Sequence, residues 1–101
     1  MTKDADKLLC CVYKTYLERR NSGMSKEDSR YFENDFYKSD SHLSSWSYDD
    51  IDDTLNELKC LGYVKKSVTG SFELLDESVE YMENRFKNGL AEVLDIISKI
   101  F

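Results

Sequence analysis

Hydrophobic positions recur at intervals of three and four residues along several stretches of the chain, which is the spacing of amphipathic helices. The first stretch covers residues 4–20, and the second runs from Ser25 to about residue 33. A third begins at Ser47 and stops before Gly62. Each of the two serines precedes an acidic residue by three positions, which is a form of the capping box that starts a helix. The pattern predicts three helices before residue 63.

Two short strands and one long helix are predicted after the third helix. Residues 63–67 and 71–75 read as the strands of a β-hairpin with Gly70 in its turn. Asp76 is expected to cap a single last helix over 76–101. Residues 34–46 show no periodicity and are expected to form a long ordered loop, partly packed by its aromatic side chains. The chain is therefore predicted to be one domain over 1–101, α+β and mainly α.

The segment "LNELKCLGYVKK", followed by a hairpin and "FELL", resembles the junction of third helix and wing in winged-helix proteins. Many winged-helix regulators carry a Leu-x-x-Leu-x-x-x-Gly-aromatic/aliphatic-aliphatic pattern there. The chain is similar to small bacterial or phage members of this superfamily and loosely to MarR/PadR-type and YjcQ-type domains, chiefly over 47–86. The resemblance implies a winged helix of three helices and a two-stranded wing hairpin, with a long C-terminal helix. In DNA-binding relatives the third helix enters the major groove.

The charge of the predicted third helix departs from that of DNA-binding relatives. Its buried stripe is Ile51, Leu55 and Leu58, which leaves the acidic residues largely on the exposed face. The candidate partner-binding residues there are Asp49, Asp50, Asp53, Asn56 and Glu57. Carboxylates repel phosphate, and the whole chain has a net charge of −6. The face could be simply solvated, could bind a basic protein partner, could read DNA directly or could mimic DNA.

Cations that could contact a nucleic acid are few. The predicted wing offers Lys65 and Lys66, whose side chains alternate between the two faces of a strand, and Lys59 lies near the end of the third helix. These three could contact one phosphate or one acidic partner, but edge-strand solubility explains the wing pair as well. A transcription regulator that binds DNA through the wing and helix ends is therefore the alternative to protein recognition.

The last predicted helix carries more apolar surface than a small domain needs on one side. A three-four spacing of apolar residues runs from Val79, and a second apolar stripe lies beside it from Leu90 onward. Part of this surface is expected to pack on the first helix and part on a second copy, since two-fold dimers are the commonest oligomers. The expected dimer residues are Leu90, Val93, Leu94, Ile97, Ile100 and Phe101.

The sequence holds no nucleophile motif, no Gly-rich phosphate loop and no set of metal ligands. No catalytic residue, metal, cofactor or small-molecule substrate is therefore expected. Cys10 and Cys11 fit apolar helix positions, and His42 fits a polar loop. No apolar run reaches the roughly 20 residues of a bilayer span, and the N-terminus lacks a signal-peptide hydrophobic region. An odd number of cysteines fits reduced thiols, so a cytoplasmic location is expected.

These observations together predict a non-catalytic regulatory module of winged-helix type. It is expected to be a homodimer that recognises a protein partner through its acidic third helix, without a membrane contact.

Overall fold

The computed structural model describes all residues 1–101. Its α-helices are α1 (Lys3–Asn21), α2 (Lys26–Arg30), α3 (Tyr48–Cys60), α4 (Asp76–Arg85) and α5 (Leu90–Ile100), and a short 3-10 helix, η1, covers Phe36–Ser39. The strands are β1 (Tyr31–Phe32), β2 (Val64–Lys66) and β3 (Phe72–Leu74). The fold is α+β and mainly helical, with one small antiparallel sheet.

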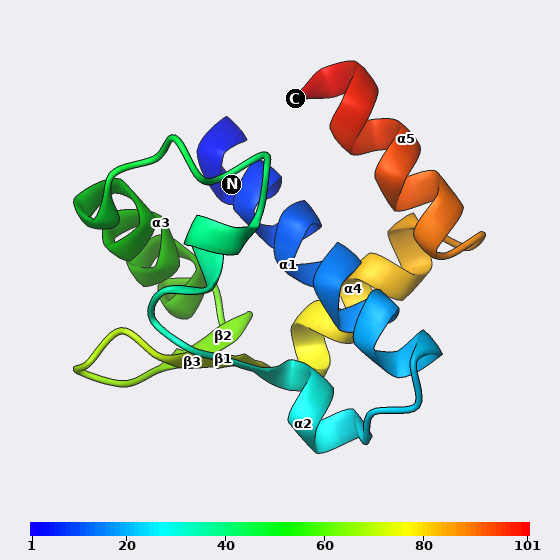
Figure 1. Ribbon diagram of the computed structural model, residues 1–101, viewed down its shortest axis with the longest axis horizontal. Coiled ribbons are helices and arrows are strands. Elements are labelled where there is room, and N and C mark those ends of the chain that lie inside the picture. Colours follow the sequence, from blue (N-terminus) through cyan, green and yellow to red (C-terminus); the bar gives the residue numbers. More distant parts are fainter.

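Helix α1 is the central element and contacts each of the other four α-helices. Figure 1 shows it running between α3 on one side and α5 on the other. Its buried residues are Ala5, Leu8, Leu9, Cys10, Cys11, Val12, Tyr13 and Tyr16. Neighbouring residues of a helix point about 100° apart, so the burial of both Cys10 and Cys11 means that α1 is covered on several sides. Their prediction as core residues is confirmed.

The predicted starts of α2 and α3 and the predicted end of α3 are confirmed. Ser25 and Ser47 begin α2 and α3, and the hydroxyl oxygen of each accepts the backbone N–H three residues later at 3.1 Å. Gly62 follows α3 with a φ of +81°. The N–H groups of Gly62 and the next residue return to carbonyls of the last helical turn, which closes the helix.

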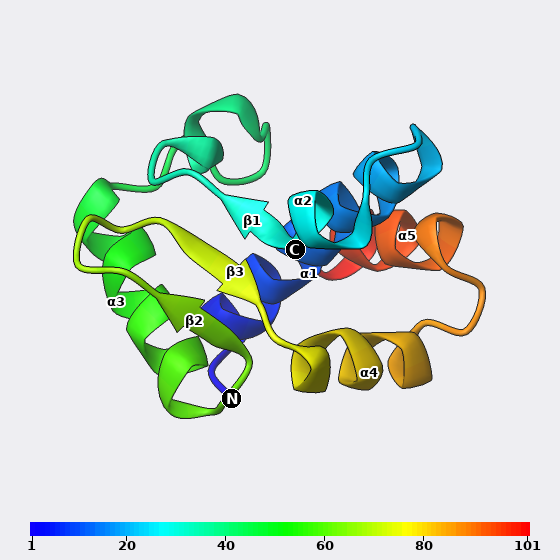
Figure 2. The same cartoon turned by 90° about the horizontal axis from the view of Figure 1, so that it is seen from below.

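The sheet has three antiparallel strands in the order β1-β3-β2, one strand more than predicted. The predicted second helix extended to residue 32 or 33, but α2 ends at Arg30 and the next two residues pair with β3. Phe32 is fully buried and stacks on Phe72 of β3, with 5.1 Å between ring centroids. Burying this ring against β3 outweighs a further helical turn. In Figure 2 the sheet lies in front of α1 and α3, and no helix covers its near face.

The prediction of a single helix over 76–101 is wrong, because the chain turns between α4 and α5. Gly89 in this turn has a φ of +71°, which L side chains rarely adopt. The turn lets Phe86 pack near Tyr13 of α1, with 6.5 Å between ring centroids, while α5 lies along α1. A single straight helix could not pack both Phe86 and the buried face of α5 against α1.

The predicted capping role of Asp76 is also wrong. Leu75 occupies the cap position of α4, and no side-chain hydrogen bond caps this helix. The Asp76 carboxylate instead forms an ion pair with Arg30 of α2, which holds the pKa of that carboxyl below its ordinary value through the hydrogen bond from the guanidinium. The contact links α2 to the start of α4.

Candidate functional site

The outward side of α3 is a line of four exposed residues that we call the α3 stripe: Asp49, Asp53, Asn56 and Cys60. Steps of four, three and four residues place them on one face of a helix. The buried face opposite is formed by Ile51, Leu55 and Leu58, as predicted. The five ion pairs of the structure include neither Asp49 nor Asp53. Both carboxylates are therefore open to a partner.

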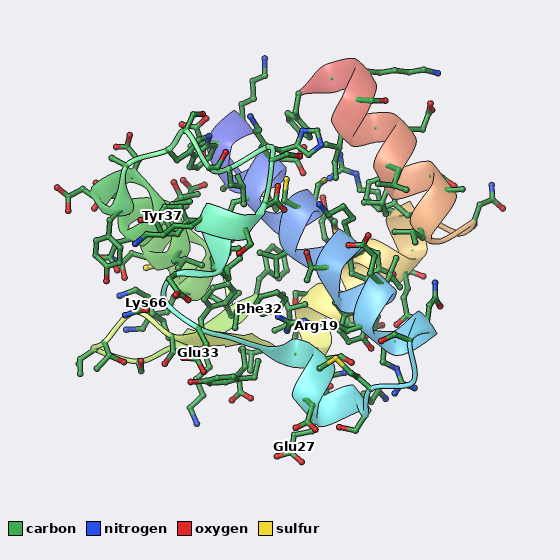
Figure 3. All side chains as sticks on the ribbon, in the orientation of Figure 1. Arg19, Glu27, Phe32, Glu33, Tyr37 and Lys66 are labelled. Carbon is green, nitrogen blue, oxygen red and sulfur yellow. The ribbon has the colours of Figure 1, made fainter.

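One flank of the α3 stripe is neutralised by the hairpin. Asp52 Oδ1 lies 2.9 Å from Lys66 Nζ of β2, and the Lys66 side chain is only 11% exposed. Figure 3 shows Lys66 beneath α3. The cation that the sequence offered as a phosphate contact is thus paired within the chain. The sequence does not indicate this role for Asp52, because the pairing depends on how the hairpin returns to α3.

The other flank is tied to the N-terminus. The Glu57 carboxylate accepts the backbone N–H of Thr2 at 2.9 Å and its hydroxyl at 2.8 Å. These two bonds, the backbone one first, hold the pKa of Glu57 below its ordinary value. Thr2 also caps α1 by accepting the N–H of Ala5. Glu57, a predicted partner-binding residue, therefore already has a partner inside the chain.

Asp50 lies away from the α3 stripe. It lines a surface hollow of about 490 Å³ together with Lys3 of α1 and Trp46, next to the C-terminal end of α5. Of the five predicted partner-binding residues, Asp49, Asp53 and Asn56 share one free face. Asp50 and Glu57 lie toward the N-terminal end of α1 instead.

The tip of the hairpin is held against the start of α3. Gly70, with a φ of +95°, lies so close to Tyr48 that a Cβ at this position would be 2.6 Å from the phenolic oxygen. The Asn34 side-chain amide donates to the carbonyl of Thr69 at 3.0 Å. The hairpin is therefore packed on the body of the protein and does not project as a separate arm.

Lys59 and Lys65 remain exposed and outside the ion pairs of the structure. Lys65 stands directly opposite Glu73 of β3, whose other cross-strand neighbour is Tyr31. All three side chains of this row are exposed or half-buried, so the row lies on the open face of the sheet. Lys66 points to the opposite face, so the predicted alternation is confirmed. The three lysines do not form one basic patch.

The six predicted dimer residues divide into a buried and a surface group. Val93 and Ile97 are 0% and 1% exposed, because they belong to the core of the single chain. The residues that stay at the surface, exposed or half-buried, are Leu90, Leu94, Ile100 and Phe101. Leu94 and Ile100 are 43% and 55% exposed. Any contact with a second copy through α5 would involve this second group.

The three cysteines are free thiols with different surroundings. Burial, the largest cause, raises the pKa of both the Cys10 and Cys11 thiols to about 12. Cys60 is exposed at the end of the α3 stripe. It is the accessible thiol of the chain.

Comparison of the chain with protein-family models, curated proteins and solved structures finds no match. The structure has no group of three or more His, Cys, Asp or Glu side chains arranged to hold a metal ion. None of its helices has the length and apolar character needed to cross a bilayer.

Proposed function

We propose that the chain is a non-catalytic regulatory module of winged-helix type that binds a basic segment of a protein partner through the α3 stripe. One observation carries the proposal. One acidic residue on each flank of the stripe is engaged within the chain, Asp52 with Lys66 and Glu57 with Thr2. The stripe carboxylates are left without any such partner. Opposite charge on a partner would complement them.

The arrangement of the elements supports the winged-helix part of the proposal. Helix α3 is followed directly by the β2–β3 hairpin, as in the junction on which the sequence resemblance rests. The hairpin belongs to an antiparallel sheet that packs beside α3. The three free thiols support a cytoplasmic location, where cysteines stay reduced.

The alternative, a DNA-binding regulator, has less support. Lys66 is neutralised by Asp52, and the hairpin tip is held by Tyr48. Only Lys59 and Lys65 remain near this region, whereas a nucleic-acid footprint needs a dense basic patch.

We also propose that the module forms a two-fold dimer through the outer side of α5. Leu94 is a large apolar side chain that the chain itself leaves 43% exposed, and the half-buried Leu90 lies one turn earlier on the same face of α5. A second copy of the same helix presents the same surface, which is self-complementary under two-fold symmetry.

The test uses a lysine-rich peptide titrated into the isotope-labelled protein at low salt. We expect chemical-shift changes centred on Asp49, Asp53 and Asn56. The double change Asp49→Asn with Asp53→Asn should weaken binding about threefold to tenfold, as loss of two exposed charge pairs implies. A control with Asp28→Asn and Asp35→Asn changes net charge equally at exposed positions outside α3.

Equal weakening by the control pair would mean that only net charge matters, and the α3 stripe would lose its role. A duplex DNA that binds at low salt, and binds more tightly after the stripe aspartates are changed to asparagine, would instead support the DNA alternative.

A further inference from the structure

A second hollow, of about 310 Å³, lies between α1 and the segment of β1 and η1. Its charged lining residues are Lys14, Glu18, Arg19 and Asp40. Phe36 of η1 adds aromatic surface, and the fully buried Phe32 also borders the hollow. The volume is at the lower end of the range of small-molecule sites, about 300–1,000 Å³. No motif marks this hollow, because its charges come from two segments that only the fold brings together.

Two of the four charges neutralise each other. Lys14 Nζ lies 3.1 Å from Asp40 Oδ2, and the two side chains are 13% and 6% exposed. The other carboxylate oxygen of Asp40 accepts the backbone N–H of His42 at 2.8 Å. This buried pair is therefore a preformed wall of the hollow with no net charge.

Arg19 is a half-buried cation without an anionic partner. Its guanidinium lies over the ring of Phe32, 4.3 Å from the centroid, and one terminal nitrogen donates to the Tyr31 carbonyl at 2.6 Å. Figure 3 labels Arg19 and Phe32 near the centre of the molecule, between α1 and β1. Burial lowers the pKa of Arg19. No hydrogen bond of the structure uses Nε or the second terminal nitrogen, which form the edge that binds a carboxylate in a bidentate manner.

Glu18 is the second unpaired charge of the hollow. It is exposed, precedes Arg19 directly and takes part in no ion pair. A simple anion would meet Glu18 as well as Arg19, and a simple cation would meet Arg19 as well as Glu18. A ligand that carries both charges matches the two together.

We propose that this hollow binds a free α-amino acid with an apolar side chain. The carboxylate of the ligand pairs with the Arg19 guanidinium, its ammonium group pairs with the Glu18 carboxylate, and its side chain packs against Phe36. Stacking on Phe32 and the bond to the Tyr31 carbonyl hold the guanidinium in place before the ligand arrives, which reduces the entropic cost of binding. This site is independent of the α3 stripe and of the proposed partner.

The experiment is a titration of the isotope-labelled full chain with each common L-amino acid, up to about 10 mM, a range that detects millimolar affinity. We expect saturable shifts for apolar amino acids in the amides of residues 14–19 and 36–40. The same ligand without its ammonium group, and the same ligand without its carboxylate, should each bind at least about tenfold more weakly, because each loses a charge-assisted contact.

Two variants locate the ligand. Arg19→Gln should abolish saturable binding, and Glu18→Gln should weaken it about tenfold. The exposed Glu18 side chain takes part in no hydrogen bond or ion pair of the fold, so Glu18→Gln tests the site even if Arg19→Gln does not fold. Glu80→Gln, an exposed change on α4, should leave affinity unchanged.

Three results would overturn the proposal. One is the absence of saturable shifts with every amino acid tested. Another is a deaminated ligand that binds as tightly as the amino acid, which would make the hollow an anion site. The third is unchanged affinity in Glu18→Gln.

Discussion

Asp52 of α3 and Lys66 of β2 form an ion pair in which the lysine side chain is almost covered, so that the hairpin is fastened to α3 by a contact between charges. Lys66→Ala should lower the free energy of unfolding by about 1 kcal/mol, because it removes both the pair and the packed alkyl chain. Lys65→Ala, on the exposed sheet face, should change it by less than about 0.5 kcal/mol. Urea unfolding of the two variants measures the difference, and equal effects would contradict the role of the pair.

Gly70 and Gly23 have nearly the same φ, +95° and +98°, but different surroundings. A Cβ on Gly23 would meet nothing within 4 Å. Gly23→Ala should therefore lower the free energy of unfolding by about 1 kcal/mol, through backbone strain alone. Gly70→Ala should cost roughly 1 kcal/mol more, because the new methyl displaces the Tyr48 hydroxyl. Thermal unfolding checks both variants. Adding Tyr48→Phe to Gly70→Ala should recover part of the loss, and no recovery would show that the contact is not the cause.

One thiol should react in the native protein. The thiolate is the reactive form of cysteine, and the pKa of about 12 leaves Cys10 and Cys11 protonated at pH 8, where burial also blocks reagents. Labelling with a maleimide, followed by mass spectrometry, should therefore modify Cys60 alone. In Cys60→Ser no label should enter until denaturant is added. Rapid native labelling of that variant would contradict the burial of α1.

The Thr2–Glu57 contact should make a small part of stability depend on pH. The folded-state pKa of Glu57 is depressed from its ordinary 4.5, so the contact stabilises the fold above that value and its contribution is lost as the pH falls through the lower, folded pKa. Carboxyl carbon NMR should show Glu57 titrating below its ordinary value of 4.5. Thr2→Ala should move the Glu57 midpoint part of the way upward, since the backbone N–H remains. An unchanged midpoint would mean that the hydroxyl bond is not formed.

Two substitutions on α5 separate dimerisation from folding. Leu94→Glu places a charge on an exposed position and should yield a folded monomer in sedimentation experiments, with unchanged circular dichroism. Ile97→Glu buries an unpaired carboxylate in the core and should unfold the chain. A wild-type protein that sediments as a monomer at high micromolar concentration would end the dimer proposal.

Signals that lie within a few residues predicted the corresponding structure well. Helix α3 begins after Ser47 and ends before Gly62, as expected, and the apolar spacing identified its buried side. Strand β1 was missed because it exists through pairing with residues 72–73, about 40 positions later. The turn at Gly89 had a local signal, the Asn-Gly pair of residues 88–89, but the apolar spacing continues through it and favours one helix.

The candidate site was predictable to the same extent. Helix periodicity alone places Asp49 and Asp53 on the outside of α3. It cannot indicate that Glu57 is hydrogen-bonded to Thr2 or that Lys66 is paired with Asp52. Each of these contacts joins residues from two different segments of the fold. The hollow beside Arg19 likewise arises from packing between segments that are distant in the sequence.

Cys60 gives the protein an intrinsic attachment point for an optical reporter. It stands eleven residues after Asp49 on the same helix face, or about 16 Å along the axis at 1.5 Å per residue. A fluorophore coupled there would sense the occupancy of the stripe from its far end. Because the other two thiols are covered, the wild-type sequence can be labelled at one place, and binding can be followed by emission without any engineered residue.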